Sequence, residues 1–389
     1  MSEPPSQPWT QALADLQARG LHRALREIES AQSVHLHIEG RDVTSFCTNN
    51  YLGLANHPQV VAAVKDAVDR WGWGSGASRL VTGTMSPHIE LERKLATFKR
   101  TEAALVCSTG YQANLAAIRA LAGEGDVLFL DKLNHASIID AARGSGAIVR
   151  VFPHRDYDKL ERLLDRYASA GRRVIVTDSL FSMDGDLADL PKLVELKRRY
   201  DAMLCVDEAH ATGVFGDSGG GLTEAMKVEF NVDVIVGTLS KALGGLGGFI
   251  AGSRSFIDWV VNTAGAFIYT TAPPPAACAA ASTAIDLVQQ DPQRRQRLLA
   301  MSERLRQTID ERFPGRTGSS KSQIIPLIIG DADATMRLSR QLEEQGLLIP
   351  AIRPPTVPQG SARLRISLSS EHTDSDLSHL VEALSRALT

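Results

Sequence analysis

Seven short apolar runs recur between residues 103 and 251, separated by stretches typical of helices. Most of the runs are continuously apolar rather than alternating, which is the pattern of strands covered on both faces. Their spacing of about 20 to 30 residues favours alternating strands and helices around a mostly parallel sheet. The runs are Ala103 to Val106, Val127 to Leu130, Ile148 to Phe152, Val174 to Thr177, Met203 to Val206, Val232 to Val236 and Phe249 to Ala251.

A chain of 389 residues exceeds the usual ceiling for one hydrophobic core, so we expect at least two domains. We expect an α/β protein with a large sheet domain over residues 51–285. A small α/β domain would follow over residues 286–389. The N-terminal segment, residues 1–50, would pack with the small domain.

The segments outside the sheet have their own patterns. The first thirty residues have apolar positions at spacings of three and four, which predicts helix, and residues 35–46 alternate like a strand pair. A long helix-prone stretch runs from about Ala276 to Phe313. The remainder predicts strands over 322–329 and 363–368, a helix over 334–345, and a last amphipathic helix through Leu388.

The composition narrows the class of protein. The formal net charge of −3 argues against a general nucleic-acid binder, which is usually strongly basic. No window approaches the roughly 18 apolar residues of a membrane span, and the polar N-terminal residues lack the apolar stretch of a secretory signal. The four cysteines form no CxxC pair and read as free thiols. We expect a cytoplasmic protein that spans no membrane.

Polar or glycine-rich sequence follows five of the predicted strands. In a parallel sheet, ligands bind beyond the carboxyl ends of the strands, so these segments should converge on one site. The five segments are Ser108 to Tyr111, Asp131 to His135, Asp178 to Gly185, Asp207 to His210 and Thr238 to Lys241.

The segment Asp207-Glu208-Ala209-His210 matches the acidic motif of some ATPases. That interpretation also needs a phosphate loop of the form G-x-x-x-x-G-K-[ST], and the chain contains no Gly-Lys pair. An acidic strand end with a helix cap is the structural alternative, but it leaves His210 unexplained.

Lys241 follows a predicted strand and precedes a glycine-rich run. A single lysine is usually a solvated charge, but apolar surroundings would favour the neutral, nucleophilic amine. Pyridoxal phosphate needs such an amine, together with an acid at its ring nitrogen, for which Asp207 is the candidate. The turn at Gly110 precedes a predicted helix whose N-terminus could bind the phosphate.

Taken together, these motifs resemble the α-oxoamine synthases among the fold-type-I pyridoxal-phosphate enzymes. The resemblance runs from about Leu21 to the C-terminus and implies an aspartate-aminotransferase-like fold. Residues 351–358 are most like the member that acts in biotin biosynthesis. The motifs are Asn49 to Leu54, Gly72 to Gly76, Asp131 to Ser137, Phe181 to Asp186, Val206 to Gly213, Ser240-Lys241, Ala351 to Pro358 and Ala362 to Arg365.

The resemblance implies a role for each matching residue. Lys241 would bond to the cofactor and then serve as base and acid, Asp207 would pair with the ring nitrogen, and His135 and His210 would contact the ring. The other cofactor contacts would be Gly110, Tyr111, Ser182, Thr238, Thr270 and Thr271, the last two reaching the partner of a homodimer. The substrates would contact Arg23, Asn49, His135, Arg353, Thr356 and Arg365.

The implied reaction is a decarboxylative condensation of L-alanine with a pimeloyl thioester, carried on CoA or on an acyl carrier protein. A glycine-dependent family member with another acyl donor, or a non-catalytic interaction protein on the same fold, are the alternatives. Either histidine, taken singly, could also be a core residue, and Arg353 a surface charge. We expect no metal site, since Asp184-Gly-Asp186 reads as a turn. Some family members carry Glu where this chain has Asp178, so no role is assigned to Asp178.

Overall fold

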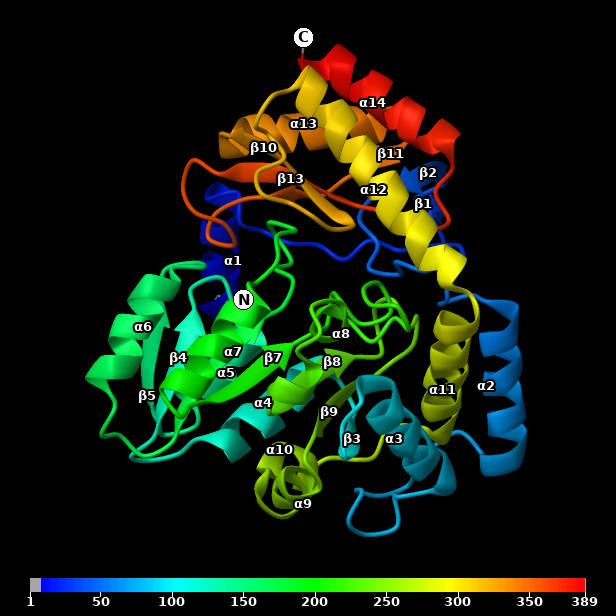
Figure 1. Ribbon diagram of the computed structural model, residues 1–389. Helices are drawn as coiled ribbons and strands as arrows, with labels where there is room; N and C mark the ends of the chain where they lie inside the picture. Colours follow the sequence, from blue (N-terminus) through cyan, green and yellow to red (C-terminus); the bar gives the residue numbers. More distant parts are fainter. Residues whose placement is uncertain (1–7, 389) are drawn as a thin grey trace, which may run out of the picture.

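The computed structural model describes residues 8–388 and contains a large and a small lobe (Figure 1). The large lobe is built on a seven-stranded sheet of order β3-β9-β8-β7-β6-β4-β5, in which only β9 is antiparallel to its neighbours. The prediction of a mostly parallel α/β sheet is therefore confirmed. The strands are β3 (Ala103–Cys107), β4 (Val127–Asp131), β5 (Ile148–Phe152), β6 (Arg173–Asp178), β7 (Met203–Asp207), β8 (Val234–Thr238) and β9 (Gly248–Gly252).

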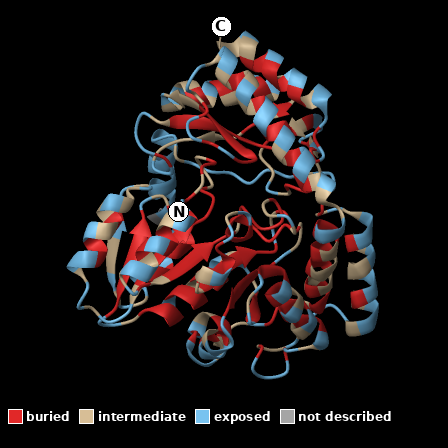
Figure 2. Ribbon diagram, viewed as in Figure 1, coloured by how far each residue is buried: buried red, intermediate tan, exposed pale blue. Residues whose placement is uncertain are grey.

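Helices cover both faces of this sheet. Successive residues of β6 point to opposite faces, so that Val174 and Val176 belong to one hydrophobic cluster and Ile175 to another. Figure 2 shows buried strands between helices whose outer sides are exposed. The first cluster contains residues of α4 (Gly110–Leu121), α5 (Ala136–Arg143), α9 (Arg254–Thr263) and α10 (Gly265–Ile268). The second contains residues of α2 (Pro58–Trp71), α3 (Ser86–Lys99), α6 (Tyr157–Arg166), α7 (Leu190–Arg199), α8 (Leu222–Ala225) and α11 (Pro275–Gln290).

The small lobe contains two short sheets. The first has the order β10-β13-β12 and lies beneath three helices (Figure 1). In the second, β1 pairs with β2, which pairs in turn with β11, so the N-terminal strands join the C-terminal part of the chain. The division into domains at residues 50 and 285 stays a prediction. The elements are β1 (His35–Ile38), β2 (Arg41–Ser45), α12 (Pro292–Arg312), β10 (Ile324–Gly330), α13 (Ala332–Glu344), β11 (Leu347–Leu348), β12 (Ala351–Ile352), β13 (Ala362–Ser367) and α14 (Asp374–Leu388).

Two helix predictions are wrong in extent. Of the first thirty residues, α1 (Pro8–Ala18) is helical, residues 1–7 lie outside the described part, and residues 21–30 form no helix. Leu25 is fully exposed, so the apolar spacing there finds no surface to pack on, and Ile28 instead makes a β-bridge with Ile38. The stretch from Ala276 to Phe313 is two helices separated at Asp291, because the following Pro292 disfavours helical backbone at Asp291.

No helix within residues 8–388 combines the length and the hydrophobicity needed to cross a lipid bilayer. A one-turn 3₁₀ helix, η1 (Glu229–Asn231), completes the described helices.

A fully buried ion pair ties α3 to the turn after β7. Lys99 Nζ donates to Glu208 Oε2 and to Thr212 Oγ1, each at 2.8 Å, and also to the carbonyl of Gly220. Glu208 Oε1 accepts the backbone N–H of Thr223 at 2.8 Å. A buried charge is tolerated when it is paired and hydrogen-bonded in this way. Glu208, part of the ATPase-like segment, therefore braces the turn that carries Asp207 and His210.

Replacing only one partner should destabilise the protein strongly. Lys99→Met leaves the Glu208 carboxylate buried without a cation and should lower the free energy of unfolding by about 3 to 5 kcal/mol in urea titrations. The double variant Lys99→Met/Glu208→Gln should recover part of that loss. As a control, Lys192→Met breaks an exposed pair with Glu195 and should change the free energy of unfolding by less than about 1 kcal/mol. A double variant no more stable than Lys99→Met would contradict this account.

Candidate active site

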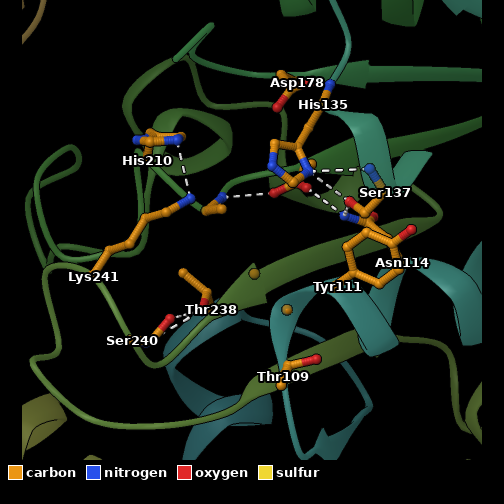
Figure 3. A pocket seen from close by; sticks show the side chains of 14 residues that line it. Thr109, Tyr111, Asn114, His135, Ser137, Asp178, His210, Thr238, Ser240 and Lys241 are labelled. Carbon is orange, nitrogen blue, oxygen red and sulfur yellow. Dashed lines mark hydrogen bonds between the residues drawn. The ribbon is translucent and has the colours of Figure 1, made fainter. Parts of the chain in front are cut away.

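A cavity of about 240 Å³ lies at the carboxyl ends of the parallel strands (Figure 3). It brings together residues from β6, β7 and β8, the loop after β8, and the N-terminal ends of α4 and α5. Seven of the fifteen site residues expected from the sequence line it: Gly110, Tyr111, His135, Asp207, His210, Thr238 and Lys241. Its other lining residues are Thr109, Asn114, Ser137, Asp178, Ala209, Gly237 and Ser240.

Lys241 reaches this cavity from the loop that follows β8 (Figure 3). Its Nζ lies 3.0 Å from Nε2 of His210. Burial lowers the pKa of Lys241, although the charges of Asp207 and Asp178 oppose that shift. The loop can pack tightly because Gly244 has a φ of +66°, and a Cβ there would lie 2.3 Å from the backbone nitrogen of Ala55. The amine is therefore held in a setting that favours its neutral form.

Asp207 ends β7 and is fixed by two donors. Its Oδ2 accepts the side-chain amide of Asn114 at 2.7 Å, and its Oδ1 accepts the backbone N–H of Ala209 at 2.8 Å. Hydrogen bonds to a carboxylate favour its ionised form. A buried carboxyl group that two donors fix toward the cavity is what a protonated ring nitrogen would require as a partner.

His135 caps the N-terminus of α5 at another strand end. Its Nδ1 lies 2.7 Å from Ser137 Oγ, and its backbone N–H donates to Asp178 Oδ2 at 2.9 Å. Loss of solvent lowers the pKa of His135, with the charge of Asp207 opposing the shift. Ser137 Oγ also accepts the side-chain amide of Asn114, so a single asparagine links His135 to Asp207.

The opposite end of the cavity can bind an anion. The first N–H groups of a helix lack partners within the helix, and α4 begins at Gly110 beside the hydroxyls of Thr238 and Ser240. Thr238 Oγ1 lies 2.7 Å from Ser240 Oγ. Gly110 allows this approach, because a Cβ there would lie 3.2 Å from Thr238 Cβ. The first N–H groups of the helix are donors suited to a phosphate, and the two hydroxyls lie beside them, with Thr238 Oγ1 donating to the carbonyl of Gly247 at 2.9 Å.

The side chains present fit pyridoxal phosphate. An amine, a fixed carboxylate, two imidazoles and a phosphate-binding helix end surround one cavity, and each matches a part of that cofactor. The fit rests on the chemistry of these donors. Lys241 would hold the aldehyde end, Asp207 the ring nitrogen, and the start of α4 the phosphate.

The remaining expected residues lie outside this cavity's lining. Arg23, Arg353 and Thr356 line a second cavity of about 280 Å³ in the small lobe and N-terminal segment. Arg365 is buried on β13 and donates through Nε to the backbone carbonyl of Ser182 at 2.5 Å.

Three further expected residues are placed by single contacts. Asn49 accepts a hydrogen bond from the hydroxyl of Tyr51. The carbonyl of Thr271 accepts one from Ser108, and the preceding Thr270 is half-buried. None of these three residues lines the cavity that contains Lys241.

Sequence reasoning missed two polar residues that organise the site. Asn114 lies one turn inside α4, and only its spacing from Gly110 could have indicated that it faces the cavity. Tyr51 belongs to a motif that supported the family resemblance, but nothing in its spacing indicated that its hydroxyl lies 2.7 Å from Nδ1 of His210.

A second polar cluster holds the loop that contacts Arg365. His154 bridges Oδ1 of Asp131 and Oδ2 of Asp186, each at 2.9 Å, and Ser319 of the small lobe also donates to Asp186. The carboxylates of Asp184 and Asp186 have different partners, because Asp184 accepts from Arg363. Burial opposes the charged imidazolium, but the two carboxylates outweigh it and raise the pKa of His154 to about 9.

This cluster predicts a loss of stability at alkaline pH. A histidine whose pKa is raised on folding stabilises fully below its unfolded value, so the contribution should disappear between about pH 6.5 and 9. Because solvent partly screens the charges around His154, the free energy of unfolding should fall by about 2 kcal/mol. Urea titrations of the parent and of His154→Gln across this range would measure it. Equal pH dependence in both proteins would contradict the assignment.

The chain is similar to known proteins over nearly its whole length. Residues 41–384 match the family described as aminotransferase class I and II. An 8-amino-7-oxononanoate synthase from Geobacter sulfurreducens is 48% identical over 376 residues, covering 96% of each chain. The structure of a serine palmitoyltransferase from Sphingomonas wittichii has a TM-score of 0.92 at 35% identity, covering 98% of this chain and 96% of that one. An 8-amino-7-oxononanoate synthase from Francisella tularensis has a TM-score of 0.78 at 28% identity, covering 89% of this chain and 98% of that one.

Proposed function

The chain belongs to the aminotransferase class I and II family, and we propose that it condenses L-alanine with a pimeloyl thioester to give 8-amino-7-oxononanoate, CO₂ and a free thiol. The observation that carries this proposal is the cavity in which Lys241, Asp207, His135 and His210 meet. The near full-length identity to 8-amino-7-oxononanoate synthases supports the choice of reaction within the family. The product belongs to biotin biosynthesis.

Pyridoxal phosphate is the cofactor of the proposed reaction. It supplies a protonated ring that accepts electrons from the substrate Cα. The N-terminal N–H groups of α4, with Thr238 and Ser240, would hold its phosphate, and Asp207 would hold the ring nitrogen. Ser182 and Thr270 and Thr271, the last two acting across a homodimer, complete the proposed contacts.

Lys241 carries the proton transfers of the reaction. Its lowered pKa leaves more of the amine neutral, as a base at the substrate Cα requires. Removal of the Cα proton allows a bond to form between Cα and the acyl carbon, and the thiol leaves. The carboxylate of alanine then departs as CO₂, and a proton returns to Cα. His135 shapes the wall of the cavity where these bonds change.

Cations bind the two substrates at opposite ends. Arg365, held on buried β13 by Ser182, has the planar guanidinium that pairs with the carboxylate of alanine. The second cavity, with Arg23, Arg353 and Thr356, has the charge to hold the free carboxylate of a pimeloyl chain. Asn49 would also contact the acyl donor, as the family resemblance implies. An acyl donor with one acidic end fits this arrangement better than a purely apolar one.

The high TM-score to serine palmitoyltransferase favours a second candidate, the condensation of L-serine with a long acyl thioester. A shared fold does not decide between substrates. The 48% identity to an 8-amino-7-oxononanoate synthase exceeds the 35% identity to that transferase, and Arg23 and Arg353 suit a dicarboxylic acyl chain.

Three properties complete the proposal. The protein acts as a homodimer in the cytoplasm, with large and small domains that divide near residue 285. Its acyl donor is carried on CoA or on an acyl carrier protein. A glycine-dependent reaction with a short acyl donor is the alternative within the same family.

Loss of the amine should abolish cofactor attachment. Lys241→Ala removes the group that bonds to pyridoxal phosphate, so its absorbance band in the near-visible region should disappear and condensation should stop. Absorbance spectra and a thiol-release assay would measure both effects. A retained turnover rate in Lys241→Ala would exclude the proposed role of Lys241.

A substrate panel decides among the candidate reactions. Thiol release should be fastest with L-alanine and a pimeloyl thioester, and slower with glycine or L-serine and with acetyl or palmitoyl thioesters. Arg353→Met should weaken the binding of the pimeloyl thioester more than the binding of an acyl donor without a free carboxylate. Preference for glycine with a short acyl donor, or for serine with palmitoyl, would overturn the proposal.

A further inference from the structure

A chain of hydrogen bonds leads from Asn49 to Lys241. The hydroxyl of Tyr51 donates to Asn49 Oδ1 at 3.1 Å and lies 2.7 Å from Nδ1 of His210. On the other side of the ring, Nε2 of His210 lies 3.0 Å from Lys241 Nζ. Tyr51 is fully buried, and Gln323 donates to the backbone carbonyl of His210 at 2.9 Å. His210 is thus fixed at its backbone and at both ring nitrogens.

Counting protons along this chain gives the direction of each bond. Burial raises the pKa of Tyr51, so its hydroxyl keeps its single proton, which it gives to Asn49. The Tyr51 oxygen must therefore accept from Nδ1 of His210. Burial, and then the charge of Lys241, hold the pKa of His210 well below its usual range, so the ring has only one proton. With that proton on Nδ1, Nε2 has only a lone pair and accepts from Lys241.

We propose that Tyr51, held by Asn49, is a positioning residue that fixes the tautomer of His210 and makes its Nε2 an acceptor for Lys241. This inference rests on the proposed function for the role of Lys241. The tautomer of His210 decides whether the lone pair of the Lys241 amine is free. An amine that donates an N–H to His210 keeps its lone pair free to form a bond. If Nε2 carried the proton, it would donate to that lone pair and occupy the nucleophilic atom.

The charged groups around this chain are part of the same setting. Burial, and then the nearby charges of Lys241, Arg365 and His135, lower the pKa of His210. Burial also lowers the pKa of Lys241, and the charges of Asp207 and Asp178 oppose that shift. Tyr51→Phe changes none of these charges, because the hydroxyl is neutral. It removes the acceptor that Nδ1 uses, so the tautomer with the proton on Nε2 becomes accessible. It also removes the donor to Asn49 and the hydroxyl's contacts with Arg365, Ser367 and Gln323, which the Asn49 variants leave in place.

The test reads the tautomer directly in the full-length chain without added cofactor. The protein is labelled with ¹⁵N in the histidine rings, and the His210 signal is assigned by its loss in His210→Asn. We expect a protonated Nδ1 and an unprotonated Nε2 in the parent. Tyr51→Phe should shift the proton to Nε2, whereas Tyr157→Phe, which removes an acceptor for the Asp189 N–H outside the cavity, should leave His210 unchanged.

Variants of Asn49 separate the tautomer from packing. Asn49→Asp keeps an acceptor for Tyr51 and should preserve the parent tautomer. Asn49→Ala frees the Tyr51 hydroxyl to donate to Nδ1, so the proton should move to Nε2. An unchanged His210 signal in both Tyr51→Phe and Asn49→Ala would overturn the inference.

The functional consequence has its own readout. The rate of pyridoxal phosphate uptake by cofactor-free protein, followed by absorbance, should fall about fivefold in Tyr51→Phe and stay unchanged in Tyr157→Phe. Equal uptake rates in the parent and Tyr51→Phe would contradict the proposed effect on Lys241. A parent that takes up no pyridoxal phosphate would contradict the proposed function, while the ring-nitrogen signals would still decide the tautomer.

Discussion

Loss of water at the carboxyl edge of the sheet governs the chemistry of the site. Burial disfavours the charged forms of amines, imidazoles and carboxyls, and it lowers the pKa of Lys241 and raises that of Asp178. A buried group then keeps its charge only where donors or counter-charges are supplied. Asp207 accepts hydrogen bonds from two such donors, and the neutral imidazole of His210 lies beside the amine of Lys241. The distribution of partners, rather than residue type alone, decides which group can move a proton.

The same constraint explains why paired charges surround the cavity without lining it. Lys99 and Glu208 brace the turn that carries Asp207 and His210. His154 joins two carboxylates and so fixes the loop whose carbonyl at Ser182 receives Arg365. Lys99 and Glu208 pair with each other, and the carboxylates of Asp131 and Asp186 pair with His154, with Arg155 also contacting Asp186. The supports can therefore be strongly ionic while the catalytic amine stays poorly solvated.

Sequence predicted the central sheet and the meeting of its strand ends, because continuous apolar runs and parallel geometry together place Asp207 and Lys241 at one edge. It failed where tertiary packing decides. Residues 21–30 have helical spacing but no surface to bury it, and Pro292 divides a helix that composition alone suggested was continuous. Tyr51 was missed for a related reason, since its contact with His210 joins residues 159 positions apart.

The strand register also places a second acid, Asp178, beside Asp207. Asp178 and Asp207 are paired Cα neighbours on β6 and β7, so two carboxyls lie at adjacent strand ends in a buried setting. Like charges that close together disfavour joint ionisation. Asp207 accepts two hydrogen bonds, from Asn114 and from the backbone N–H of Ala209, whereas Asp178 accepts one from the backbone N–H of His135. Burial, and then the charge of Asp207, raise the pKa of Asp178 well above its usual range. Asp178 therefore anchors the backbone of His135, while Asp207, with two donors, is the acid better suited to face a protonated ring nitrogen.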